Sequence, residues 1–210
     1  MKLPDNFQKR VFMTAAGVIL CAAAVGFFKC SRFGVDPFQC FAQGVWGRFF
    51  EPGISYGVYY TVLSGILLLI DLFIARNCLG VATLVNMFLT GYIVDFTAGV
   101  ITYCAPDPAL PVRVLFLAIG VLVMCFASSL YMTSNLGVSV YDAIPIVISR
   151  SRRLPFKFVR IACDLLCVII GTLSGLLPGI GTLITAFFMG PLIEFFNHRF
   201  SEPFLAGQKN

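Results

Sequence analysis

The residues best suited to bind a solute are polar groups that interrupt two apolar stretches. The interruptions cover residues 32–39 and 135–142, and each precedes a short amphipathic segment. They carry Asp36, Gln39, Asn135, Ser139, Tyr141 and Asp142. These side chains could line a substrate-binding site, or could simply cap helices, because Asp, Ser and Asn accept hydrogen bonds from the free N–H groups at a helix start. Asp142 would oppose an anion and favour a cation, an amine or a proton.

Carboxylates inside apolar stretches are a second group of candidates. They are Asp71, Asp95, Asp164 and Glu194. Ionisable groups within hydrocarbon are costly and are usually functional or paired. Asp164 lies one helical turn after Arg160, which predicts an ion pair near the membrane surface. Arg76 lies just beyond Asp71 and could pair with it.

The composition of the chain indicates an integral membrane protein. Of its 210 residues, 59% are hydrophobic and 12% are charged, about half the charged share of soluble domains. Long apolar stretches of this kind require lipid, so the lipid bilayer is an expected partner. The net charge of +5 does not indicate nucleic-acid binding, because membrane proteins place Lys and Arg in their cytoplasmic loops.

The sequence gives little support for catalysis or for a metal site. It contains no HExxH, GxSxG or Walker motif, and its single histidine, His198, follows the last apolar stretch. None of the eight cysteines forms a CxxC pair. Cys163 and Cys167 share a helix face and could bind a soft metal, although small buried apolar residues are the favoured interpretation. We therefore expect no enzyme activity, no metal and no cofactor.

An internal repeat organises the chain. Residues 10–47 align without a gap with 113–150, and residues 80–96 align with 179–195. Asp95 then matches Glu194, and Asn86 matches Thr185, two polar residues that could face a central cavity. The predicted organisation is one membrane domain with repeat units at 1–97 and 112–197, an inter-repeat loop at 98–111 and a C-terminal tail at 198–210.

Two segments are too short to cross a bilayer. The expected helices cover 10–28, 36–50, 56–74, 81–96, 112–132, 140–149, 158–173 and 182–196. A spanning helix needs about 20 residues, so 36–50 and 140–149 are expected to be half-helices buried in protein. The predicted fold is an all-α polytopic membrane protein with two repeats, each of three spanning helices and one half-helix.

The orientation of the repeats depends on those segments. Three crossings per unit invert the second unit, whereas eight spanning helices would give parallel repeats. Counting Lys and Arg on each side does not choose between them. The loop after 140–149 holds five basic residues and the loop after 36–50 holds one, which favours inversion. Both termini are expected to be cytoplasmic.

Three short motifs carry a family resemblance. They are Asn135-Leu-Gly followed by Tyr141-Asp142, then Gly179-Ile-Gly-Thr-Leu183, and Gly190-Pro-Leu-Ile-Glu194. Here the chain resembles the YczE/YitT family of bacterial integral membrane proteins, most strongly over 113–196. The resemblance implies a multi-pass protein of the bacterial cytoplasmic membrane without a well-established substrate. Some members are tied to production or export of peptide-type secondary metabolites.

Two functions remain open from the sequence. The favoured one is a bacterial inner-membrane transporter that moves an unknown small solute by alternating access between the two repeats. The alternative is a non-transporting accessory protein that assists assembly, export or regulation of another system, through a membrane partner or as a homo-oligomer.

Overall fold

The computed structural model describes residues 6–54 and 56–206, and in these ranges it contains helices and no strand. The helices are α1 (Phe7–Ser31), α2 (Pro37–Phe49), α3 (Tyr56–Ile74), η1 (Arg76–Cys78), α4 (Val81–Cys104), α5 (Leu110–Ser134), α6 (Val140–Arg152), α7 (Phe156–Leu173), α8 (Ile180–Phe196), η2 (Asn197–Ser201) and α9 (Glu202–Ala206). The prediction of an all-α protein is confirmed.

The two polar interruptions end one helix and begin the next in the same way. Gly34 and Gly137 have φ angles of +118° and +127°, a left-handed region that glycine adopts readily. The Asp36 side chain then accepts a hydrogen bond from the Gln39 N–H at 3.1 Å, and Ser139 accepts one from the Asp142 N–H at 3.2 Å. Helix capping by Asp36 and Ser139 is therefore confirmed.

Several predicted boundaries are wrong. Helix α4 continues to Cys104, so the connection to α5 covers only 105–109 rather than 98–111. The expected C-terminal tail is helical as far as Ala206. Its side chains are held by the rest of the molecule: the Phe200 ring lies 6.3 Å from the Phe126 ring, and Ser201 forms a buried hydrogen bond with Ser129.

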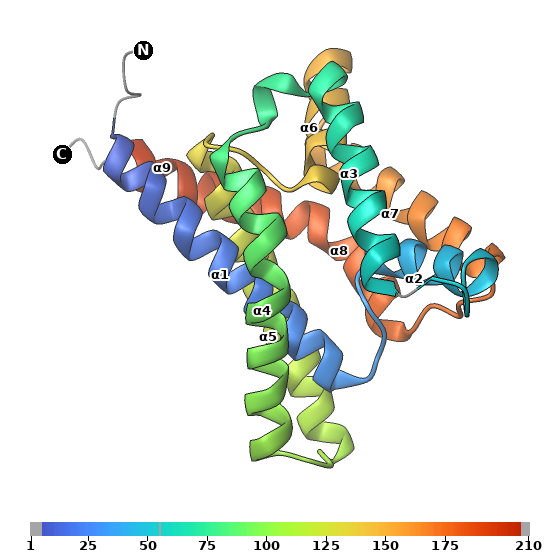
Figure 1. Ribbon diagram of the computed structural model, residues 1–210. Coiled ribbons are helices and arrows are strands. Elements are labelled where there is room, and N and C mark those ends of the chain that lie inside the picture. Colours follow the sequence, from blue (N-terminus) through green and yellow to red (C-terminus); the bar gives the residue numbers. More distant parts are fainter. Residues whose placement is uncertain (1–5, 55, 207–210) are drawn as a thin grey trace.

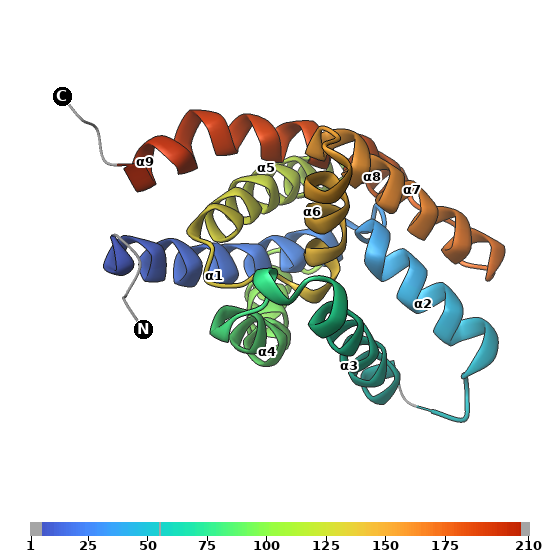
Figure 2. The same cartoon turned by 90° about the horizontal axis from the view of Figure 1, so that it is seen from above.

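Helices α1 and α5 pack side by side in opposite directions at the centre of the molecule (Figures 1 and 2). Arg10, near the start of α1, donates to the Ser134 carbonyl at the end of α5 at 2.8 Å. Arg113, near the start of α5, donates to the Ser31 carbonyl at the end of α1 at 2.8 Å. Each arginine thus satisfies a carbonyl that its partner helix leaves without an intrahelical hydrogen bond.

The middle of this helix pair is closely packed. Cys21 Sγ lies 3.1 Å from Met124 Sδ, which is its counterpart in the alignment of 10–47 with 113–150. A side chain at Gly17 would contact the Ala127 backbone. Small residues allow helices to approach closely within a membrane. The apolar core surrounding the pair is formed by Ala24, Phe28, Leu117, Val121, Met124, Cys125, Met189 and Ile193.

Each interruption contacts a segment at or just before the start of a helix from the other half of the chain. The Gly181 N–H donates to the Phe33 carbonyl at 2.8 Å, and the Val138 N–H donates to the Cys78 carbonyl at 3.0 Å. A side chain at Gly179 would overlap the Phe33 carbonyl. The short helices α2 and α6 follow the same crosswise pattern, since α2 packs on α7 and α6 packs on α3.

Three helices are long and apolar enough to span a membrane in the part of the chain that the structure describes: Phe7–Ser31, Leu110–Ser134 and Ile180–Ala206. Shorter apolar helices cover Val58–Ile74 and Tyr92–Cys104. Large apolar side chains point outward, among them Phe73 and Tyr103 at 88% and 90% exposure, as lipid contact requires. The count of six crossings stays a prediction.

Candidate functional site

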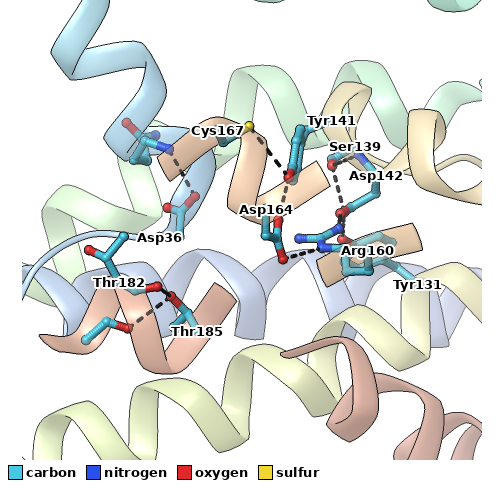
Figure 3. A network of polar contacts seen from close by, with 12 residues as sticks. Asp36, Tyr131, Ser139, Tyr141, Asp142, Arg160, Asp164, Cys167, Thr182 and Thr185 are labelled. Carbon is cyan, nitrogen blue, oxygen red and sulfur yellow. Dashed lines mark hydrogen bonds and ion pairs between the residues drawn. The ribbon is translucent and has the colours of Figure 1, made fainter. Parts of the chain in front are cut away.

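A buried cluster of charged residues lies where α6 and α7 meet (Figure 3). Arg160 on α7 forms ion pairs with Asp142 on α6 and with Asp164, the latter at 3.1 Å. The three residues are at most 5% exposed. An i, i+4 pair of Arg160 and Asp164 was predicted and is present. The pair is buried in the protein, and its place relative to the membrane surface stays a prediction.

Hydroxyl groups complete the cluster. Tyr131 and Ser139 both donate to Asp142, Ser139 at 2.7 Å. Tyr141 donates to Asp164 and lies with its ring 4.8 Å from the Arg160 guanidinium. With both carboxylates ionised, the three charges sum to one negative charge in a low-dielectric interior. Such a group persists only when its hydrogen bonds are well satisfied.

The first turns of the two short helices α2 and α6 meet beside this cluster. The Phe38 ring of α2 stacks on the Tyr141 ring of α6, with centroids 4.8 Å apart. These two rings occupy matching positions in the aligned segments. Figure 3 shows Asp36, Thr182 and Thr185 gathered next to the cluster. Thr182 donates to the Val35 carbonyl at 2.6 Å, which ties the first interruption to α8.

A cavity of about 440 Å³ opens at one end of the molecule. Arg10, Thr133, Asn135, Arg150 and Asn197 contribute polar groups to its wall. Its volume suits a small organic molecule. The predicted site residue Asn135 lies here, at the end of α5, and not in the buried cluster.

Helices α6 and α7 lead from this cavity to the cluster. Ile146 and Arg150 of α6 line the cavity, and Asp142 lies one turn before Ile146. Phe156 at the start of α7 also lines the cavity, and Arg160 follows one turn later. Since one helical turn rises about 5.4 Å, the floor of the cavity is adjacent to the charged residues.

The other predicted residues are dispersed. Thr185 is buried and donates to carbonyls of its own helix, Gly181 and Thr182. The Gln39 side chain is half-buried on α2. Asn86 and Asp95 belong to α4, and their side chains lie outside the described part of the structure.

Two of the predicted carboxylates lie apart from the cluster. Glu194 on α8 has an oxygen 3.8 Å from the Lys157 ammonium. Asp71 is 1% exposed, and neither of its carboxylate oxygens has a hydrogen-bond partner. Among the side chains that the structure describes, Asp71 and Arg76 form no ion pair. Asp71 is buried, whereas Arg76 is exposed beyond the end of α3. That predicted pairing is therefore wrong.

Two members of the cluster were not predicted as site residues. Arg160 was assigned only to a surface ion pair, and Tyr131 lies near the end of an apolar stretch. One signal in the sequence could have identified Arg160 as a member of the cluster. It lies near the start of an apolar helix, and a charged residue in such a helix needs a buried partner. Within the described residues, no three His, Cys, Asp or Glu side chains are grouped as a metal site requires.

The apolar helices and their outward apolar side chains define this chain as a multi-pass membrane protein. It belongs to DUF6198, a family of unknown function, whose model matches residues 8–198. No solved structure matches the chain.

Three bacterial relatives are similar to it. An uncharacterized protein of Haemophilus influenzae is 30% identical over 56% of this chain, and the match spans 53% of that relative, about half of its length. The uncharacterized membrane protein YczE of Bacillus subtilis is 22% identical over 86% of this chain and 81% of its own. The uncharacterized protein YyaS of Bacillus subtilis is 21% identical over 86% of this chain and 88% of its own.

Proposed function

We propose that this chain is a bacterial inner-membrane transporter that moves a small solute by alternating access between two inverted repeats. The observation that carries the proposal is the meeting of the two half-helices, with Phe38 stacked on Tyr141. In many transporters, interrupted helices from inverted repeats converge on the substrate site in this way. The charged cluster and the open cavity lie directly beside that meeting point.

The reciprocal contacts support the inversion. Arg10 bonds the end of α5 and Arg113 bonds the end of α1, while the counterparts Cys21 and Met124 touch each other. Exchanged contacts of this kind, with counterparts meeting in the middle, are the mark of a two-fold axis. Because α1 and α5 run in opposite directions, such an axis lies perpendicular to them. An axis perpendicular to spanning helices lies in the membrane plane and inverts one unit.

The charge distribution sets the expected orientation. Arg10 and Arg150 line the open cavity, and Arg152 and Arg153 end α6 on the same side. Basic residues concentrate on the cytoplasmic side of membrane proteins. The start of α1 and α9 also lie at this end, where Asn6 donates to the Leu205 carbonyl at 3.1 Å (Figure 1). Both termini are accordingly cytoplasmic.

Solute-induced currents in proteoliposomes test the proposal. The purified protein is reconstituted and exposed in turn to small organic cations, amino acids and carboxylates. We expect a current for at least one class, which Asp142→Asn abolishes because it removes the charge paired with Arg160. Arg153→Gln, on an exposed residue, is the matched control and leaves the current unchanged. Currents that survive Asp142→Asn contradict the assignment of the site.

One observation favours the accessory function as a second candidate. Each charged group of the cluster has a protein partner, so the cluster could serve as a purely structural connection between α6 and α7. If no solute class induces a current, and a second membrane protein copurifies with this chain at fixed stoichiometry in mild detergent, the accessory function is supported over transport.

A further inference from the structure

A second, smaller cavity lies at the opposite end of the molecule. Its volume is about 100 Å³. It lies at the end of α1, where Lys29, Cys30 and Arg32 line it together with Ala98 and Thr102 of α4. The large cavity lies at the end of α5, where Met132, Thr133 and Asn135 line it together with Asn197 at the end of α8.

The two cavities occupy corresponding places. In the alignment of 10–47 with 113–150, Cys30 is the counterpart of Thr133 and Arg32 is the counterpart of Asn135. Both Arg32 and Asn135 are left-handed residues that end their helices, with φ of +57° in each case. The same structural position therefore borders an open cavity of about 440 Å³ at one end and a constricted cavity of about 100 Å³ at the other.

Polar contacts lie at and beside the small cavity. Arg32 Nη1 lies 3.3 Å from Asp107 Oδ1, in the connection between α4 and α5. Cys30 Sγ lies 3.7 Å from the Ala98 carbonyl and 3.8 Å from Thr102 Oγ1. These contacts hold the end of α1 against α4. At the large cavity, Asn135 takes the place of Arg32 and lies exposed on the wall.

We propose that the two cavities are the two mouths of one solute pathway, open beside Asn135 and closed beside Arg32 by the Arg32–Asp107 ion pair. The proposal rests on the proposed function and adds to it which mouth is open and what closes the other. Two inverted units that exchange conformations would open the small cavity as the large one closes. The cluster of Asp142, Arg160 and Asp164 lies beneath the open mouth.

Thiol reactivity at the two counterpart positions tests the coupling. Two proteins with a single cysteine are made. One keeps Cys30 with every other cysteine replaced, and the other lacks all native cysteines and carries Thr133→Cys. Both proteins are reacted with a hydrophilic neutral maleimide in nanodiscs, which leave both faces accessible. Position 133 is expected to react faster than position 30, because its cavity is the larger.

Asp107→Asn then removes the ion pair. The rate at position 30 should rise about two- to fivefold, the population shift expected when an exposed ion pair is lost, and the rate at position 133 should fall in the same protein. Glu51→Gln, on another exposed carboxylate, should change neither rate. A rise at position 30 with an unchanged rate at 133 means that the pair covers Cys30 only locally, and overturns the proposal. Unchanged rates at both positions also overturn it.

A cross-link gives a second measurement that does not depend on the ion pair. Thr102→Cys places a thiol opposite Cys30 in the small cavity, and copper-phenanthroline joins the two. With the small cavity held closed, the rate at Thr133→Cys should stay high and no longer respond to Asp107→Asn, and reduction should restore the response. A response that persists in the cross-linked protein contradicts coupling between the mouths. Proteoliposome currents without coupled rates would leave transport standing and remove only this inference.

Discussion

Arg160 is the residue on which the buried cluster depends. It pairs with Asp142 and Asp164, and its guanidinium lies over the Tyr141 ring. Without it, two carboxylates would face each other in the interior with only hydroxyl donors. Burying an ion pair costs free energy, and leaving one of its charges buried without a partner costs more.

Removal of this cation should destabilise the protein. We expect Arg160→Gln to lower the free energy of unfolding by about 3–5 kcal/mol, the usual cost of breaking a buried pair. Arg152→Gln, at the exposed end of α6, serves as the control and should have little effect. Thermal unfolding in a fixed detergent measures the difference, and an equal stability of the two variants would mean that the cluster is not buried as described.

The sequence predicted much of this site at the level of single residues. Ser139, Tyr141 and Asp142 were identified by their place in the second interruption, and all three join the cluster. Asn135 was grouped with them, but the left-handed backbone at the end of α5 directs it to the cavity. The part played by Arg160 could not be predicted, because the helical period shows which residues share a face and not which helix covers that face.

At the level of elements, the two interruptions behave alike. The sequence predicted the starts of α2 and α6 well, since Asp36 and Ser139 are strong caps. It failed at the end of α4 and at α9, although Pro106 and Gly207 follow closely after the two helix ends. At the C-terminal end, tertiary contacts stabilise the longer helix. Phe126 and Ser129 of α5 extend the C-terminal helix in this way.

The docking of α8 against the first interruption requires glycine. We expect Gly179→Ala to destabilise the protein by about 1–3 kcal/mol, because its methyl group would overlap the rigid Phe33 carbonyl. Gly65→Ala is the matched control, since nothing lies within 4 Å of an added methyl there. Unfolding midpoints of the two variants give the comparison. A Gly179→Ala protein as stable as Gly65→Ala would show that the interruption does not dock on α8.

Arg10 and Arg113 should contribute alike if their contacts are truly exchanged. Each donates to a helix-end carbonyl at 2.8 Å, so Arg10→Met and Arg113→Met should each lower stability by about 1.5–3 kcal/mol, the value of a hydrogen bond from a charged group. The exposed Arg48→Met is the control. A loss confined to one arginine would argue against equivalent roles.

For the whole molecule, we propose that two units of one chain are inverted about a shared polar centre. The sequence alignment predicted two units, but an alignment of residues holds no information about direction in the membrane. The proposed direction is based on the antiparallel contact of α1 and α5 and on the meeting of α2 and α6 at Phe38 and Tyr141. It also decides whether alternating access is available to this protein.

Labelling of single cysteines in intact cells tests the inversion most directly. In a Cys-depleted background, one cysteine is placed at position 48, after α2, or at position 151, near the end of α6, and an impermeant maleimide is applied from outside. With inverted units, we expect position 48 to be labelled and position 151 to be protected, because the two half-helices would then enter from opposite sides. Protection at both positions, with labelling at position 76, would mean parallel units and would contradict the inverted arrangement.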